Sequence, residues 1–368
     1  MAAAAAPSAP TQAQLIQQDA ALVAALLANS TEYYTRGPAV SGPLGQALNI
    51  QMPTSGIMVA VDLDISIPVT ITAAATANAI GAPGAITNVA VQDWYGNTRT
   101  SVSASRLRSL AGYRMGRPYN RIAAALNNDT ANFIGDALPT AVGAGTVRFK
   151  LHIPIAQGGS SLVGALLTQT SNGTCQVVLQ SLASLVSATN PHAPYSAGTM
   201  TYGNITVTPS FRFLMPSTFL PQTLPVLSLS TAYAVQDIRN TEALVAGAQN
   251  YTNFPPARTV WSQILDYVNG DQVNFGSDLD LIEVIVNGAT PLKSWTPYTR
   301  LIEQRLLLGA DDIPGRYYLP FRSRPINTAI LGSFQLRLTP GVVNAGAYLV
   351  VASEMTYPMG TPLPGLAV

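Results

Sequence analysis

Hydrophobic and polar residues alternate along much of the chain, as they do in strands that bury one face. Between residues 57 and 71 every odd position is apolar, while the even positions include Asp62, Asp64 and Thr70. Successive side chains of a strand point to opposite faces of the sheet, so this run predicts one long strand. Pro68 has no backbone N–H to donate, and we therefore expect a bend or a sheet edge there.

The same alternation returns at residues 147–155, 175–179, 205–213 and 334–338. Short alternating runs separated by turns rich in Gly, Pro, Asn and Ser indicate antiparallel β-sandwiches. Cys175 falls on the apolar side of its run, which favours a buried small side chain over a nucleophile.

The N-terminal segment has a helical period instead. Its apolar residues form one stripe, made of Leu15, Ile16, Leu22, Val23, Leu26 and Leu27. Thr11 and Gln14 have the spacing of a capping box, and Asn29 suits a helix end. The segment therefore predicts an amphipathic helix over about residues 11–29. Its stripe either packs under a sandwich or docks on a neighbouring subunit or a membrane.

A longer unit occurs twice, at residues 86–116 and 279–309. Each copy reads as an apolar strand, a turn with glycine, a polar stretch and a helix rich in Arg and Leu that ends in glycine. The copies lie about half a chain apart. We therefore predict two related sandwiches in tandem, with a boundary near the Pro-rich stretch 215–225.

Arginines cluster on the two helices of this repeated unit, at Arg106, Arg108, Arg114, Arg300 and Arg305. Arginine suits both polar contacts between subunits and phosphate binding, because its planar group donates several hydrogen bonds at once. We predict intersubunit contacts and keep a phosphate-binding patch as the alternative.

The composition excludes several classes of protein. Only 10% of the residues are charged, and 19 Lys+Arg nearly balance 18 Asp+Glu, so no basic excess supports nucleic-acid binding. A hydrophobic content of 48% argues against disorder. The N-terminus lacks the basic residues of a signal peptide, and its apolar run is too short for a membrane span.

Few residues suit catalysis or metal binding. The chain has two histidines, His152 and His192, and no phosphate-binding loop, nucleophile elbow or zinc motif. Asp62 and Asp64 share one strand face, where they suit either Ca²⁺ binding, acid–base work or a plain polar surface. We predict no catalytic residue, no cofactor and no metal site.

The order of the elements and several local sequences resemble those of a known family. The chain resembles the major capsid protein of tectiviruses, the tailless icosahedral bacteriophages with an internal membrane. The segments that carry the resemblance are LPVLSLSTAYAVQD (224–237), VNFGSDLDLIEVIV (273–286), GRYYLPFRSRPINTAILGSFQLRLTP (315–340) and, in the first half, residues 146–167 followed by TCQVVLQ.

The resemblance implies an all-β fold of two tandem eight-stranded jelly rolls, with the N-terminal helix and a short helix in each roll. The corresponding parts are an N-terminal arm and helix (1–35), a first jelly roll (36–216), a second jelly roll (217–357) and a C-terminal Pro-rich tail (358–368).

The resemblance further implies a major capsid protein rather than an enzyme. Its homotrimers, pseudo-hexameric in outline, would tile an icosahedral virion shell over an internal membrane, beside penton and minor capsid proteins. The chain would be made in the bacterial host cytoplasm and would bind no specific nucleic-acid sequence. The stripe from Leu15 to Leu27 would lie at the base of the shell, facing the membrane.

The function of a capsid subunit would also explain the low share of charged residues. Charged residues are depleted in interface cores because desolvating them is costly. We therefore expect uncharged faces between subunits, with most charged residues paired or turned to the two surfaces of the shell. The alternatives are a receptor- or glycan-binding β-sandwich of a spike, which would cluster aromatic residues at loop tips, and a β-sandwich hydrolase, for which only Asp62 and Asp64 are available.

Overall fold

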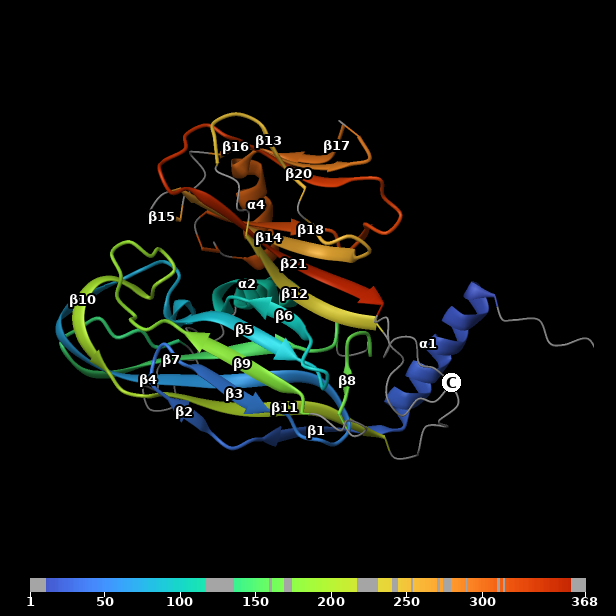
Figure 1. Ribbon diagram of the computed structural model, residues 1–368, viewed down its shortest axis with the longest axis horizontal. Helices are drawn as coiled ribbons and strands as arrows, with labels where there is room; N and C mark the ends of the chain where they lie inside the picture. The colour runs from blue at the N-terminus through green and yellow to red at the C-terminus, as the bar shows by residue number, and fades with distance from the viewer. Residues whose placement is uncertain are drawn as a thin grey trace, which may run out of the picture.

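Two β-sandwiches lie stacked on one another in the computed structural model, and one helix, α1, extends away from their side (Figure 1). The structure describes residues 11–116, 136–158, 161–168, 174–216, 231–239, 244–252, 254–269, 272–273, 279–288, 290–309, 312–313 and 315–358.

Helix α1 (Gln12–Ala28) has the predicted capping box. The backbone N–H of Thr11 donates to Oε1 of Gln14 at 2.8 Å, and the backbone N–H of Gln14 donates back to the Thr11 hydroxyl. Asn29 ends the helix through its backbone N–H, which donates to the carbonyl of Ala25. Both predicted helix ends are confirmed.

The first jelly roll consists of two facing sheets, which we call sheet 1 and sheet 2. Sheet 1 has the order β1 (Ser30–Arg36) and β2 (Val40–Gly42), then β11 (Ile205–Pro216), β4 (Ile57–Ala77) and β7 (Gly143–Pro154), with β10 (Tyr195–Tyr202) and β8 (Leu166–Leu167) also on β4. Sheet 2 has the order β3 (Ala47–Gln51), β9 (Gln176–Ser181), β5 (Ile86–Gln92) and β6 (Thr98–Val102). Sheet 1 already includes Ser30, so its first strand begins before residue 36.

The second jelly roll repeats this arrangement in sheets 3 and 4. Sheet 3 has the order β12 (Thr231–Arg239), β21 (Tyr348–Pro358), β14 (Thr259–Asn269) and β18 (Arg316–Pro320), with the short strands β15 (Gln272–Val273) and β19 (Ile326–Asn327) on β14. Strand β12 also pairs in parallel with β6, at Gln236 and Ser101, so sheets 2 and 3 are the two parts of one continuous ten-stranded sheet. Sheet 4 has the order β13 (Gln249–Tyr251), β20 (Phe334–Pro340), β16 (Leu279–Val286) and β17 (Pro291–Trp295). The strands that occupy equivalent places in the sheets of the two rolls also follow one another in the same order along the chain. The two predicted tandem jelly rolls are therefore confirmed.

The repeated unit is also confirmed. After the short helix η1 (Ala82–Ala85), strands β5 and β6 lead into helix α2 (Ala104–Met115); strands β16 and β17 lead in the same way into helix α4 (Pro297–Leu308). Ser103 and Thr296 cap the two helix starts, and Gly116 and Gly309 end them at φ 64° and 67°. Glycine suits both ends because a left-handed backbone strains residues with a Cβ.

The sheet edge expected at Pro68 is present on one side of β4 only. The pairing of β4 with β7 runs without a register shift from Ala60 to Ile71. On its other side, β4 changes partner from β11 to β10 just at Pro68, and Gly203 in the intervening turn donates to the Pro68 carbonyl. The missing N–H therefore falls where no strand needs it.

The main core lies between sheets 1 and 2, and it continues into the face of sheet 3 that the first roll covers. Tyr233, Val235 and Ile264 of sheet 3 belong to this core, whereas Leu265 and Tyr267 belong to the core between sheets 3 and 4. The strands of sheet 3 are therefore buried on both faces.

The predicted boundary at residues 215–225 falls almost wholly outside the described residues.

Candidate functional site: the joint between the jelly rolls

Helix α2 lies between the two rolls and contacts both (Figure 1). Its first side, with Leu107 and Leu110, is buried against its own roll. Its other side presents Ser105, Arg106, Ser109, Tyr113 and Arg114 to sheet 3, and we call these residues and their partners the joint.

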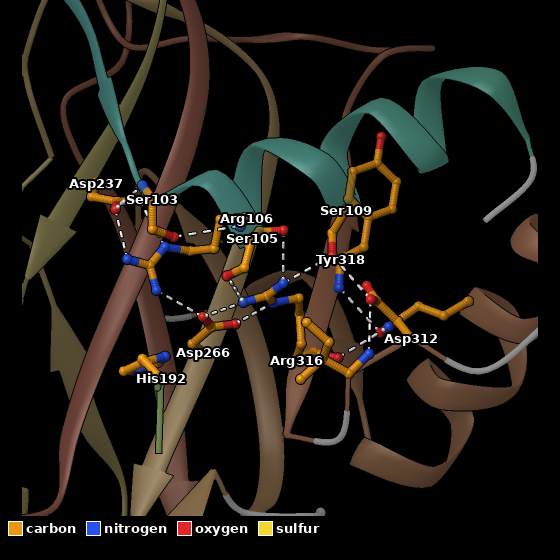
Figure 2. A network of polar contacts seen from close by, with 12 residues as sticks. Ser103, Ser105, Arg106, Ser109, His192, Asp237, Asp266, Asp312, Arg316 and Tyr318 are labelled. Atoms are coloured by element: carbon orange, nitrogen blue, oxygen red, sulfur yellow. Dashed lines mark hydrogen bonds and ion pairs between the residues drawn. The ribbon is translucent and has the colours of Figure 1, made fainter. Parts of the chain in front are cut away.

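Arg106 binds two carboxylates of the second roll. Its Nε and Nη2 donate to both oxygens of Asp237 at 2.9 and 2.6 Å, and its Nη1 donates to Asp266 at 2.8 Å (Figure 2). Asp237 also accepts from the backbone N–H of Ser103, at the start of α2. The paired geometry fixes the orientation of α2 on strands β12 and β14.

Arg316 of β18 binds the same Asp266 from the opposite side. Its Nε and Nη2 donate to the two carboxylate oxygens at 2.7 and 2.8 Å. Its remaining donors reach back to α2, to the carbonyl of Ser105 at 3.1 Å and the hydroxyl of Ser109 at 2.9 Å. Asp266 is therefore shared by one arginine from each roll (Figure 2).

These groups stay charged although they are buried. Burial works against a charge on Asp266, but the guanidinium groups of Arg316 and Arg106 hold the pKa of its carboxyl well below the usual range. Burial also disfavours the charge on Arg106, and the carboxylates of Asp237 and Asp266 outweigh it and raise its pKa. Removing one member of such a set leaves an uncompensated buried charge, which is strongly destabilising.

Aromatic rings and a second ionic cluster extend the joint. Tyr113 stacks on Tyr318 of β18 with ring centroids 4.0 Å apart, and Gln304 of α4 donates to the Tyr113 hydroxyl at 2.8 Å. Arg114 donates to Glu354 of β21 at 2.7 Å. The two rolls are thus locked by stacking and by charge-assisted hydrogen bonds.

His192 lies beside this network (Figure 2). Its Nε2 is 3.0 Å from the hydroxyl of Tyr348, and burial lowers its pKa to about 4. The ring is therefore neutral at pH 7.

The carboxylates singled out in the sequence lie on the outward face of sheet 1. Asp62 is 2.7 Å from Nδ1 of His152, and Asp64 accepts from Arg148 at 2.6 Å. Cys175 is buried, and burial raises the pKa of its thiol to about 11. Within the described residues no group of three or more His, Cys, Asp or Glu side chains is arranged to hold a metal ion.

The predicted arginines fall in different surroundings. Arg106 is part of the joint, buried Arg108 pairs with Asp136, and buried Arg300 pairs with Glu303. Arg305 is exposed in the last turn of α4. Arg106 joins the two rolls of one chain, which the sequence interpretation did not foresee.

The predicted stripe of α1 is anchored at one end. Leu26 is buried among residues of the first roll such as Ile57 and Leu214, and Val23 and Leu27 pack partly against the same cluster. Leu15 and Leu22 are half-buried, and the side chain of Ile16 lies outside the described part of the chain. No helix among the described residues has both the length and the apolar character to cross a membrane.

The sequence interpretation missed Asp237, Asp266 and Arg316. The available signal is a single charge inside an otherwise apolar run, as in ILDYV around Asp266. Such a run is typical of a strand buried on both faces, where a charge needs a partner.

Comparison with known proteins supports the same architecture. Residues 230–360 match the family model described as "P3 major capsid protein C-terminal". Among curated proteins, none matches the chain.

Three solved structures of viral major capsid proteins have a similar fold. The MCP of STIV, Sulfolobus Turreted Icosahedral Virus, is 12% identical with a TM-score of 0.65, over 89% of this chain and 97% of that chain. VP54 of PBCV-1 is 12% identical with a TM-score of 0.59, over 90% and 96%. Protein P2 of bacteriophage PM2 is 11% identical with a TM-score of 0.53, over 88% and 97%. The chain therefore has the double jelly-roll fold of these proteins.

Proposed function

We propose that this protein is a viral major capsid protein, and that three copies form a pseudo-hexameric block of an icosahedral shell. The observation that carries the proposal is the joint, which holds two jelly rolls of equal topology as one unit. The shared double jelly-roll fold and the match of residues 230–360 to a major capsid model support it.

A subunit of a shell contacts neighbouring subunits on every side, so its two jelly rolls have to keep a fixed position relative to one another. The joint supplies this property, because Asp266 links α2 of the first roll to β14 and β18 of the second. The role we propose is structural, not enzymatic, and the localisation is the capsid shell of a virion.

The distribution of charge supports extensive contact with neighbours. The chain has few charged residues, and many of those described are already paired within the chain: Arg99–Asp93, Arg106–Asp237, Arg108–Asp136, Arg114–Glu354, Arg148–Asp64, Arg212–Glu32 and Arg337–Glu283. Paired charges and uncharged polar residues are less costly to cover with another subunit than isolated charges are.

Helix α1 is suited to contacts beneath the shell. Leu26 anchors its C-terminal end on the first roll, and the helix then extends away from both rolls (Figure 1). In our proposal its stripe faces the internal membrane or the proteins beside it, and penton and minor capsid proteins complete the shell.

The mass of the purified protein in solution tests the proposal. Multi-angle light scattering at micromolar concentration should give three times the chain mass of 38.6 kDa. A protein that stays a stable monomer over a hundredfold range of concentration would contradict the trimeric capsid function.

A further inference from the structure

Helix α4 leaves uncovered the side that its counterpart α2 buries. Aligning the caps, Ser103 with Thr296 and Gly116 with Gly309, places the two helices in one register. The residues of α2 that contact sheet 3 are Ser105, Arg106, Ser109, Tyr113 and Arg114, and their counterparts on α4 are Tyr298, Thr299, Ile302, Leu306 and Leu307.

These counterparts form the exposed face of α4. The exposed fractions are 73% for Tyr298, 42% for Ile302, 80% for Leu306 and 47% for Leu307. Residues four apart lie on one side of a helix, so Tyr298, Ile302 and Leu306 make a continuous apolar stripe. Apolar surface gathered in this way marks an interaction site.

Sheet 1 is the counterpart of the sheet that receives α2, and a shared β-bulge fixes the register. In sheet 1 the pairing of β11 with β4 shifts just after Arg212, which lies opposite Ala60. In sheet 3 the pairing of β14 with β21 shifts between Val260 and Ser262, and Ser262 lies opposite Glu354. Ala60 therefore corresponds to Ser262, and Arg212 to Glu354.

The neighbouring strand confirms this register. β7 and β18 both end in proline, with Pro154 opposite Ala60 and Pro320 opposite Ser262. His152 and Tyr318 each lie two residues before the proline that ends their strand, so they correspond to one another.

The same register matches the charged positions of the joint. Asp64 corresponds to Asp266, Lys150 to Arg316 and Arg36 to Asp237.

The charges of the helices and sheets change together between the two positions. The face of sheet 3 that meets α2 carries three acids, Asp237, Asp266 and Glu354, and one base, Arg316. Helix α2 supplies the two further cations, Arg106 and Arg114, that balance these acids. On α4 these cations are replaced by Thr299 and Leu307. Sheet 1 needs no cation from a helix, because Arg36 and Arg212 stand where sheet 3 has acids, and its outward face carries four bases, Arg36, Arg148, Lys150 and Arg212, against three acids, Glu32, Asp62 and Asp64.

We propose that the exposed face of α4, from Tyr298 to Leu307, seats on the outward face of sheet 1 of a second copy of this chain. This contact repeats between subunits the joint that α2 makes with sheet 3, with Leu306 placed over His152 as Tyr113 is placed over Tyr318. Such a contact joins different surfaces of the two copies, so it generates a ring if the rotation closes. The inference rests on the proposed function, which sets the ring at three copies.

The substitution Leu306→Asp tests the contact directly. Leu306 is highly exposed in the single chain, so an aspartate is tolerated there unless a neighbour covers it. Light scattering should show a threefold loss of mass, from trimer to monomer. Ile330→Asp is the matched control, because Ile330 is 79% exposed in a loop outside α4, and that variant should remain trimeric. Circular dichroism should show both variants folded.

The outcomes separate the inference from the function on which it rests. A monomeric wild-type protein would overturn the proposed function. A trimeric wild-type protein with an equally trimeric Leu306→Asp variant would overturn the contact and leave the function standing.

A disulfide test covers the case in which Leu306→Asp does not fold. A chain with both Leu306→Cys and His152→Cys should form intersubunit disulfides on oxidation, whereas the pair Ile330→Cys with His152→Cys should not. Equal cross-linking of the two pairs would also contradict the contact.

Discussion

Sheets 1 and 3 occupy the same place in their jelly rolls, yet their strands have different sequence patterns. In β11 of sheet 1, buried and half-buried residues alternate, because one face looks outward. In β14 of sheet 3 nearly every residue is buried, because α2 covers the face that would otherwise meet solvent. Alternation therefore reports what covers a strand as much as the strand itself.

One pair of aspartates makes the same comparison at a single position. Asp266 and Asp64 correspond in the two sheets, and each binds an arginine. The Asp266 side chain is 1% exposed and the Asp64 side chain 30% exposed. The two aspartates occupy equivalent backbone positions and both bind arginine. We nevertheless expect the buried Asp266 to contribute much more to the free energy of unfolding than the partly exposed Asp64.

Replacing the buried aspartate should have the largest effect. Asp266→Asn keeps the shape of the side chain but removes the charge that two arginines share, leaving Arg106 and Arg316 undercompensated. We expect the free energy of unfolding to fall by about 3–5 kcal/mol, as for other buried pairs that lose one partner. Urea unfolding, with wild type and variant at equal protein concentration, measures the difference.

The two arginines provide the check on this interpretation. Arg106→Met in the Asp266→Asn background removes a buried charge that no longer has its full set of partners. The double variant should lose less stability than the sum of the two single variants. Strict additivity would show that Arg106 and Asp266 act independently, contrary to the geometry of the joint.

The same comparison shows how far the sequence alone could lead. The alternating strands β4, β7, β11 and β20, the capping box of α1 and the repeated strand–turn–strand–helix unit all have local signals, and the sequence predicted them. Strands β12, β14 and β18 have no such alternation, because they are covered on both sides. The joint was out of reach for a further reason: Arg106 and Asp266 are 160 residues apart, and nothing local indicates that they meet.

Acidification should affect the joint through His192, with a smaller loss. Its pKa is lowered to about 4, first by burial, and the groups of the joint around it are Asp266, Asp237, Arg106 and Arg316. An unfolded histidine takes up its proton near pH 6.5, so between about pH 6.5 and 4 the unfolded chain binds more protons than the folded chain. Stability should therefore fall as the pH drops through this window, by on the order of 3 kcal/mol.

The variant His192→Gln isolates this contribution. It cannot titrate, so its stability should change less than that of the wild type between pH 6.5 and 4, whatever its stability at pH 7. Parallel pH profiles of the two proteins would show that other groups cause the loss.

The smallest effect is expected for Asp64→Asn, at the position in sheet 1 that corresponds to Asp266. Its partner Arg148 and Asp64 itself are both partly exposed, so water replaces the lost contact, and such pairs contribute about 0–1 kcal/mol. Measured in the Leu306→Asp background, where we expect single chains, the change in unfolding free energy should stay in that range. In the wild-type background α4 of a second copy would cover this face, so the same substitution should cost more. A loss in the single chain as large as that of Asp266→Asn would mean that burial by α2 is not what separates the two sheets.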